Sequence, residues 1–165
     1  MNEKLNHAIK LRESRQLEKS NSVLTELVQS FPTDAYINYQ CAWSFDVMGE
    51  ESKAVPYYEK AIELGLSGKD LEGAIIGLGS TYRTLGQYEN SHGILVKGLE
   101  LFPDNQAIKV FFSMTLYNLQ KHSSAMEILL NSLVENSADQ DIQKYKKAIT
   151  FYADKLDETW GKNND

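Results

Sequence analysis

The sequence repeats itself at intervals of 34 to 37 residues. The stretch MGEESKAVPYYEKAIELG at 48–65 aligns with LGQYENSHGILVKGLELF at 85–102, at an offset of 37 residues. QSFPTD at 29–34 also aligns with ELFPDN at 100–105, which makes Pro32 and Pro103 equivalent. Repeats therefore begin at positions 1, 35, 72 and 106, with spacings of 34, 37 and 34. Such a period is typical of chains that stack one small supersecondary unit several times.

Two places in every repeat hold only small residues. The eighth place holds Ala8, Ala42, Gly79 and Ser113, and the twentieth holds Ser20, Ala54, Ser91 and Ala125. Small residues at facing positions of two antiparallel helices allow their backbones to approach closely. Large neighbours can then interlock around them, namely Leu24, Tyr58, Leu95 and Leu129. The pattern predicts a helix-turn-helix unit.

The turns of this unit are also visible. Gly49 and Gly86 follow an apolar residue at the end of the first helix, where a left-handed glycine stops a helix. Pro32 and Pro103 lie just beyond the second helix and prevent its continuation. The second repeat has residues 66–69 there instead, and we expect its three extra residues to form a longer turn between repeats.

The third repeat resembles the tetratricopeptide repeat family most closely, through Leu78, Gly79, Tyr82, Gly86, Tyr88, Leu95 and Pro103. The resemblance covers residues 1–139. Departures include Arg15 and Gln120, which stand where the turn glycine belongs, and the tryptophan place, which holds Lys4, Asn38, Ile75 and Lys109. The stretch from 82 to 160 is similar to small bacterial members of the family without an assigned activity, for which dimer formation has been suggested.

We therefore expect one all-α domain over 1–165, an α-solenoid of four stacked helix-turn-helix repeats (1–34, 35–71, 72–105 and 106–139) plus a C-terminal capping helix at 140–161. Apolar residues recur along that helix with helical spacing, at Ile142, Tyr145, Ile149, Tyr152, Leu156 and Trp160. One interpretation is that the stripe covers the last face of the stack. The other is that Tyr152, Leu156 and Trp160 pair with a second copy of the chain.

Composition narrows the classes of partner. The formal net charge of -6 disfavours binding to a phosphate backbone, so we expect no nucleic acid partner. No apolar run approaches the roughly 18 residues that a membrane span needs, so we expect no membrane association and a cytoplasmic protein. A single cysteine, Cys41, fits a reducing compartment.

Residues with the potential for catalysis are sparse. His7, His92 and His122 lie in different repeats, and none has a histidine or cysteine three or four residues away. Cys41 stands at the seventh place, a core position that Leu78 and Phe112 fill in the next two repeats, and should be an inert buried thiol. We expect no enzyme activity, no catalytic residues, no metal site and no cofactor.

The resemblance implies that first helices line a concave groove, with side chains from the second, fifth, ninth and twelfth places. The candidate binding residues at these places are Tyr36, Tyr39, Trp43, Ile76, Ser80, Arg83, Val110, Met114 and Tyr117. Family members that grip a terminal carboxylate present several cationic and amide donors in the groove. Here only Arg83, with Asn2 and Arg12, offers comparable groups, so we do not expect a carboxylate clamp.

Three functions compete. The leading hypothesis is a protein-binding adaptor whose groove takes an apolar peptide or helix. The second is a homodimer that uses the groove or the C-terminal helix for self-assembly, and the third is a small acidic secretion-type chaperone. The aromatic residues of the groove can also pack on one another or on the closing helix, which would leave less of the groove for a partner.

Overall fold

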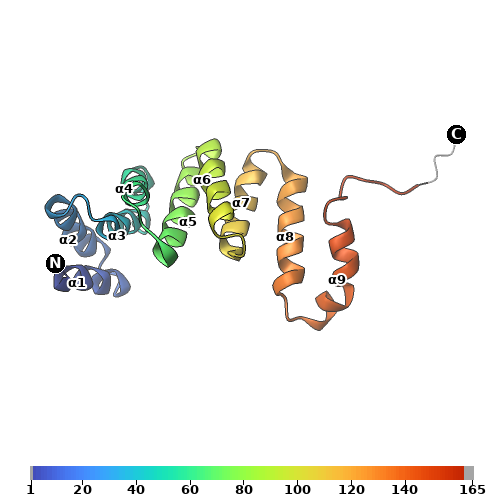
Figure 1. Ribbon diagram of the computed structural model, residues 1–165, viewed down its shortest axis with the longest axis horizontal. Helices are drawn as coiled ribbons and strands as arrows, with labels where there is room; N and C mark the ends of the chain where they lie inside the picture. Colours follow the sequence, from blue (N-terminus) through green and yellow to red (C-terminus); the bar gives the residue numbers. More distant parts are fainter. Residues whose placement is uncertain (1, 162–165) are drawn as a thin grey trace.

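The structure is a computed structural model that describes residues 2–161 as an elongated stack of helices (Figure 1). This range contains nine α-helices and no strand, which confirms the predicted all-α fold. The helices are α1 (Asn2–Glu13), α2 (Leu17–Ser30), α3 (Ala35–Asp46), α4 (Glu51–Glu63), α5 (Gly68–Thr84), α6 (Tyr88–Leu101), α7 (Gln106–Asn118), α8 (His122–Asn136) and α9 (Gln140–Tyr152). Within it, no helix is both long and apolar enough to cross a bilayer.

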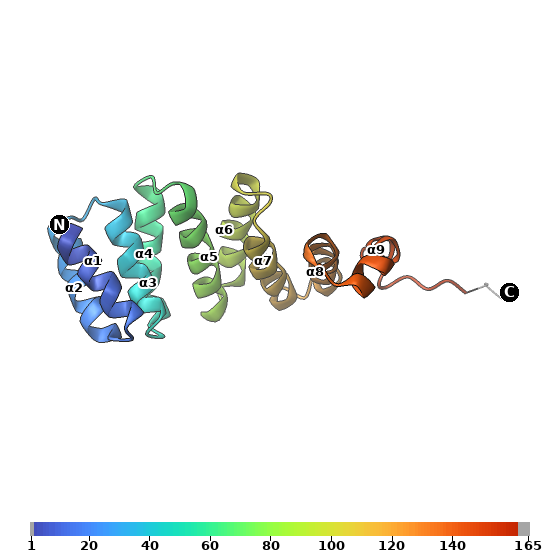
Figure 2. The same ribbon diagram turned by 90° about the horizontal axis from the view of Figure 1, so that it is seen from below.

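The helices pair and stack in chain order. The pairs α1–α2, α3–α4, α5–α6 and α7–α8 form antiparallel hairpins, and each hairpin packs against the next (Figures 1 and 2). The first helices α1, α3, α5 and α7 also contact their neighbours in this series. Between described residues, contacts join only adjacent hairpins. Each unit thus buries its apolar face against its neighbours, as expected of an α-solenoid.

The small residues at the eighth and twentieth places lie where the two helices of a hairpin meet. Ser20 Oγ donates a hydrogen bond of 2.7 Å to the carbonyl of Ala8, and Ser91 Oγ donates one of 2.7 Å to the carbonyl of Gly79. A Cβ on Gly79 would lie 2.7 Å from Leu95 Cδ2. The close helix approach predicted from the sequence is therefore present.

A left-handed residue follows the first helix of every repeat. Gly49 and Gly86 have φ angles of 73° and 74°, as predicted. Arg15 and Gln120 stand at the same place in the first and fourth repeats, and each has a φ of 62°. The turn therefore keeps one form in all four repeats, although a non-glycine residue in this conformation costs about 1 kcal/mol.

The three extra residues of the second repeat lengthen helix α5 instead of the turn before it, so the prediction of a longer turn was wrong. The linker at 64–67 is as long as the linkers at 31–34 and 102–105, whereas α5 has 17 residues against 12 in α3 and 13 in α7. The added residues extend α5 at its N-terminal end. A Lys69–Glu72 ion pair of 2.9 Å supports this extra turn, and Leu66, which is 8% exposed, anchors the linker in the core.

The C-terminal helix is shorter than predicted, because α9 ends at Tyr152, turns follow at 153–154 and 156–157, and residues 158–161 have no regular secondary structure. The Lys155 N–H donates a hydrogen bond to the carbonyl of Tyr152 at 2.9 Å, and this tight turn replaces the continuing helix. Further along, Ser123 Oγ donates to the Asp157 carboxylate, so the segment lies beside the start of α8. Trp160 then packs against Tyr152 with ring centroids 5.4 Å apart.

Candidate peptide-binding groove

The aromatic residues of the second repeat pack mainly on one another. Tyr39 is buried, and its ring centroid lies 6.3 Å from that of Tyr36 and 6.0 Å from that of Trp43. Trp43 keeps 40% of its surface exposed, but the guanidinium of Arg12 lies 3.9 Å from its ring centroid. Much of the expected aromatic wall is therefore occupied by contacts within the protein.

Arg12 is held by the second repeat. Its Nη2 donates to Gln40 Oε1 at 2.6 Å, its Nη1 donates to the Gln40 carbonyl at 3.3 Å, and the residue is only 9% exposed. Burial lowers the pKa of Arg12 from its usual value, although nearby tyrosines oppose the shift. A hollow of about 280 Å³ remains beside Trp43. Arg12 is thus engaged inside the protein rather than free for a ligand.

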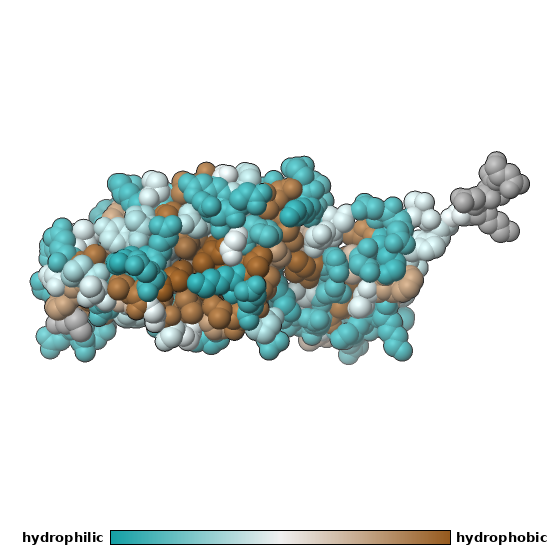
Figure 3. Space-filling view, turned by 45° about the horizontal axis from the view of Figure 1, so that its top comes forward, coloured by the Kyte–Doolittle hydropathy of each residue, from teal (hydrophilic) through white to brown (hydrophobic). Residues whose placement is uncertain are grey.

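The remaining candidate residues lie further along the stack. Ile76, Ser80 and Val110 are half-buried on α5 and α7. Met114 and Tyr117 on α7 are 41% and 62% exposed. Figure 3 shows apolar side chains gathered along the middle of the visible face over α4 to α7, with smaller apolar areas toward α8 and α9. Among the candidates on α5 and α7, Met114 and Tyr117 of α7 are therefore the most exposed.

An apolar groove of about 440 Å³ lies between α7 and α8. Its lining consists of Arg83, Ser113, Met114, Tyr117, Asn118, His122, Ala125, Met126 and Leu129. The groove brings together three of the candidate residues, Arg83, Met114 and Tyr117. Sequence reasoning did not name Met126 and Leu129, which also line the groove and are 44% and 36% exposed, as candidates.

Arg83 is the only side chain of this lining that carries a permanent charge. It is half-buried, and its Nη1 lies 3.5 Å from Asn118 Oδ1, at the limit of a hydrogen bond. Its Nε is buried without a hydrogen-bond partner. Among the ion pairs of residues 2–161, none involves Arg83. The groove therefore contains a guanidinium whose donors are largely unused.

The groove is open because the last hairpin lacks the cover that the others receive. At the twenty-fourth place, Leu24, Tyr58 and Leu95 are 0%, 2% and 0% exposed, whereas Leu129 is 36% exposed. In each buried case the first helix of the next repeat provides the cover. Leu24 packs in a cluster with Ile37 and Cys41 of α3, a Cβ on Gly77 of α5 would lie 2.5 Å from the Tyr58 ring, and Leu95 clusters with Ile108 of α7.

The helix α9 begins like a first helix of a fifth repeat. Asp139 accepts a hydrogen bond from the Ile142 N–H at 3.0 Å, just as Asp34 and Asn105 cap α3 and α7. Yet α9 contacts only α8 within the described range, and none of its residues is buried. It does not take the position over α7 and α8 that the earlier pattern would assign to it.

Two lysines of α9 disfavour the regular position of a fifth first helix. The seventh and eighth places of α9 hold Lys146 and Lys147. The second to fourth repeats have Cys41, Leu78 and Phe112 at the seventh place, and Ala42, Gly79 and Ser113 at the eighth. A regular fifth helix would carry both ammonium groups into the core without partners, which is costly. Instead Gln143 Nε2 binds α9 to the end of α8, with hydrogen bonds of 2.9 Å to the Val134 carbonyl and 2.8 Å to the Ser137 carbonyl.

A second exposed apolar feature follows α9. Phe151, Tyr152 and Trp160 form an aromatic cluster with centroid separations of 5.1, 5.4 and 6.4 Å, and they are 53%, 48% and 61% exposed. Leu156 is 47% exposed. The three residues considered as dimer contacts, Tyr152, Leu156 and Trp160, are thus on the surface.

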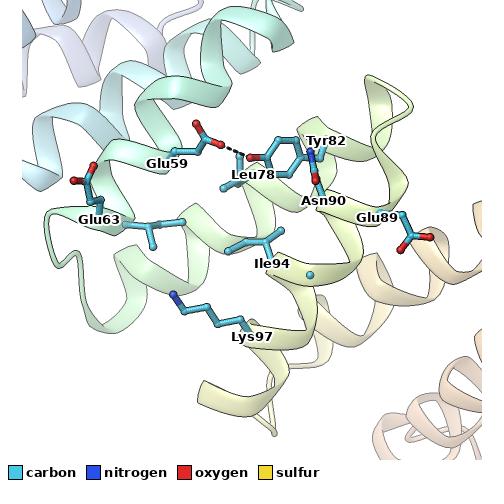
Figure 4. A pocket seen from close by; sticks show the side chains of 10 residues that line it. Glu59, Glu63, Leu78, Tyr82, Glu89, Asn90, Ile94 and Lys97 are labelled. Carbon is cyan, nitrogen blue, oxygen red and sulfur yellow. Dashed lines mark hydrogen bonds between the residues drawn. The ribbon is translucent and has the colours of Figure 1, made fainter.

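Another hollow, of about 640 Å³, lies between α4, α5 and α6 (Figure 4). In it the Tyr82 hydroxyl donates to the Glu59 carboxylate, while Lys97 extends along the opposite side. Burial and this bond raise the pKa of Tyr82 well above its usual value. Because Glu63 and Glu89 also border it, this hollow is more polar than the groove between α7 and α8.

The candidate reactive groups are placed as follows. Cys41 is fully buried, and burial raises the pKa of its thiol to about 11. The ring of His92 packs against Phe112 at 5.2 Å and that of His122 against Tyr117 at 4.7 Å, centroid to centroid. Across residues 2–161, no three His, Cys, Asp or Glu side chains are grouped as metal ligands.

Comparison with known proteins agrees with this architecture. A family model described as "Tetratrico peptide repeat" matches residues 35–156. Among curated protein sequences, none matches the chain.

Several solved structures share the fold. YrrB, described as a TPR protein with an unusual peptide-binding site, has a TM-score of 0.70 at 18% identity over 93% of this chain and 80% of its own. MamA from Desulfovibrio magneticus RS-1 has a TM-score of 0.74 at 13% identity over 92% and 88%. The pilF protein of Pseudomonas aeruginosa has a TM-score of 0.69 at 15% identity over 97% and 77%. This chain therefore belongs to the tetratricopeptide repeat family, whose fold is a protein–protein interaction module.

Proposed function

We propose that the chain is a non-catalytic adaptor that binds an apolar peptide or helix of another protein in the groove between α7 and α8. The observation that carries the proposal is the exposure of Met114, Tyr117, Met126 and Leu129 around one hollow of about 440 Å³. Scattered exposed apolar residues are ordinary, but a contiguous apolar surface marks an interaction site. The half-buried Ile76, Ser80 and Val110, with the outer face of Trp43, extend the path that a longer segment would follow.

The exposed area supports binding of moderate strength. The four groove residues are 36% to 62% exposed, so covering them contributes about 1 kcal/mol each, from about 2 kcal/mol for a fully buried apolar side chain. Four apolar side chains of a ligand add about 8 kcal/mol. Association costs about 4 kcal/mol or more. The balance corresponds to micromolar rather than nanomolar binding.

A display selection tests the proposal without a known partner. Peptides of about 16 residues, or four to five helical turns, are selected on the full chain and then measured against Leu129→Glu. We expect affinity to fall by at least about tenfold, because a carboxylate then replaces an apolar wall. Leu101→Glu is the matched control, because Leu101 is 50% exposed and lies outside the groove. Equal binding to both variants would refute the site.

The aromatic cluster favours self-assembly as a second candidate function. A homodimer could cover Phe151, Tyr152 and Trp160, which the groove ligand leaves exposed. The solution mass measured by light scattering over a concentration series distinguishes the two. A dimer that becomes monomeric in Trp160→Ala or after truncation at Tyr152 supports self-assembly. A mass equal to that of one chain at every concentration would refute self-assembly.

A further inference from the structure

Two arginines at the same place of different repeats have different surroundings. Arg12 and Arg83 both occupy the twelfth place. In the next repeat, Arg12 meets Gln40 at the sixth place and Trp43 at the ninth, and it binds both. Those places in the repeat that follows Arg83 hold Phe111 and Met114, which offer neither a side-chain carbonyl nor an indole ring.

Arg83 therefore retains binding capacity at the edge of the groove. Within the described part of the chain, its side chain makes one long contact, with Asn118, and its Nε has no hydrogen-bond partner. Among residues 2–161, no carboxylate lines the groove. A partly buried cation next to apolar walls favours a ligand that supplies a carboxylate, because charge-assisted hydrogen bonds strengthen where water is reduced.

The shape of the groove indicates the form of the ligand. Leu24, Tyr58 and Leu95 are each covered by the first helix of the next repeat, whereas Leu129 has no such helix over it and is 36% exposed. The groove lies between α7 and α8, where that helix would pack. A helix in this position satisfies its own backbone groups, whereas an extended strand would find no unpaired backbone on a helical wall.

We propose that a partner protein supplies an amphipathic helix that docks as the first helix of a fifth repeat, with one of its Asp or Glu carboxylates bound by Arg83. This inference rests on the proposed function and specifies the partner. The C-terminal ends of the first helices α5 and α7 lie side by side, because Arg83 near the end of α5 contacts Asn118 at the end of α7. Because Arg83 lies beside Asn118 at the end of α7, the acidic residue belongs in the last two turns of the docked helix.

The selected peptides provide the probe. We expect apolar or small residues three, four and seven positions apart, followed by Asp or Glu at a fixed offset in the second half. Arg83→Gln should weaken binding about 10- to 100-fold, the range for a hydrogen bond to a charged group, while Arg83→Lys should weaken it less. Lys97→Gln, an exposed lysine outside the groove, is the control for the change in charge.

A double-mutant cycle separates direct contact from a general charge effect. If Arg83 binds the peptide carboxylate, changing that residue to the amide and making Arg83→Gln together should cost little more than either change alone. A proline in the middle of the peptide should reduce binding by about 100-fold or more, because it breaks a helix.

Each other result overturns the inference in a recognisable way. If peptides bind Leu129→Glu weakly but bind Arg83→Gln as well as the parent, the proposed function stands and the carboxylate site at Arg83 is refuted. If a proline in the middle of the peptide leaves binding unchanged, the ligand is not a docked helix. A stable dimer whose groove is protected from peptides identifies a second copy as the occupant. Peptides indifferent to Leu129→Glu remove the proposed function as well.

Discussion

Replacing the two lysines that keep α9 out of the stack should close the groove. In Lys146→Leu/Lys147→Ala, α9 carries an apolar and a small residue at its seventh and eighth places, as α3 and α5 do. We expect α9 to move over α7 and α8 and to cover Leu129. The variant should therefore be more stable than the parent and should bind selected peptides more weakly.

The magnitude follows from the side chains that become covered. Met126, Leu129 and Leu133 are 44%, 36% and 45% exposed. Full burial of such a side chain contributes about 2 kcal/mol, so covering the exposed parts of all three adds roughly 2 kcal/mol to the free energy of unfolding. The m value, which is the slope of the free energy of unfolding against urea concentration, should also increase, because the more compact native state exposes more surface on unfolding.

Urea denaturation followed by circular dichroism measures this change. The control is Lys10→Leu/Lys97→Ala, which removes the same charge from exposed positions on α1 and α6. A thiol introduced by Met126→Cys reports closure, since it should react about tenfold more slowly once α9 covers it. Stability equal to that of the control, with an unchanged labelling rate, would show that the lysines are not what holds the groove open.

Three further predictions follow from the packing and burial of particular residues. Gly79→Ala should lower the free energy of unfolding by about 1 to 3 kcal/mol through overpacking, because its Cβ would lie 2.7 Å from the buried Leu95. Gly93→Ala has no neighbouring atom within 4 Å of its Cβ and should raise the free energy of unfolding by up to about 1 kcal/mol. Thermal or urea unfolding of the two variants checks both values, and equal effects would contradict the packing argument. Cys41, whose pKa burial raises to about 11, should react with a thiol reagent at pH 8 only as fast as the protein opens, so a rate near that of the unfolded chain would refute its burial. Burial also raises the pKa of Asp46, so the folded state keeps that proton to higher pH than the unfolded chain does, and stability should fall as pH rises from the unfolded pKa through the folded one. Asp46→Asn should remove this dependence, which unfolding measured across that pH range would reveal.

The repeat frame could be predicted from the sequence, because close helix packing requires small residues at the eighth and twentieth places of every repeat. Ala42 and Ala54 are both fully buried, and each stands at a place where a larger side chain would push the two helices apart. The left-handed turns were readable at Gly49 and Gly86. At Gln120 the same conformation is imposed by the repeat and not by the residue type, so local sequence could not reveal it.

The sequence predicted which side chains point toward the groove, but not which of them are exposed. Tyr117 is exposed beside a hollow, whereas Tyr39 is buried against its neighbours. A helical position shows which way a side chain points, not whether another side chain lies over it, and Arg12 over Trp43 is such a case. The signal for the open end was present in Lys146 and Lys147, which stand where the frame requires small or apolar residues.

Because each hairpin contacts only its neighbours in the part of the chain that the structure describes, local opening should spread inward from the two ends of the stack. The helix α9, which packs against α8 alone within residues 2–161, should exchange its amide hydrogens first, and residues 153–161 should be the first substrate for a protease. The interior helices α4 and α5 should open only with the whole stack. A ligand bound against α8 would therefore delay digestion at the far C-terminal end, beyond the residues that it touches.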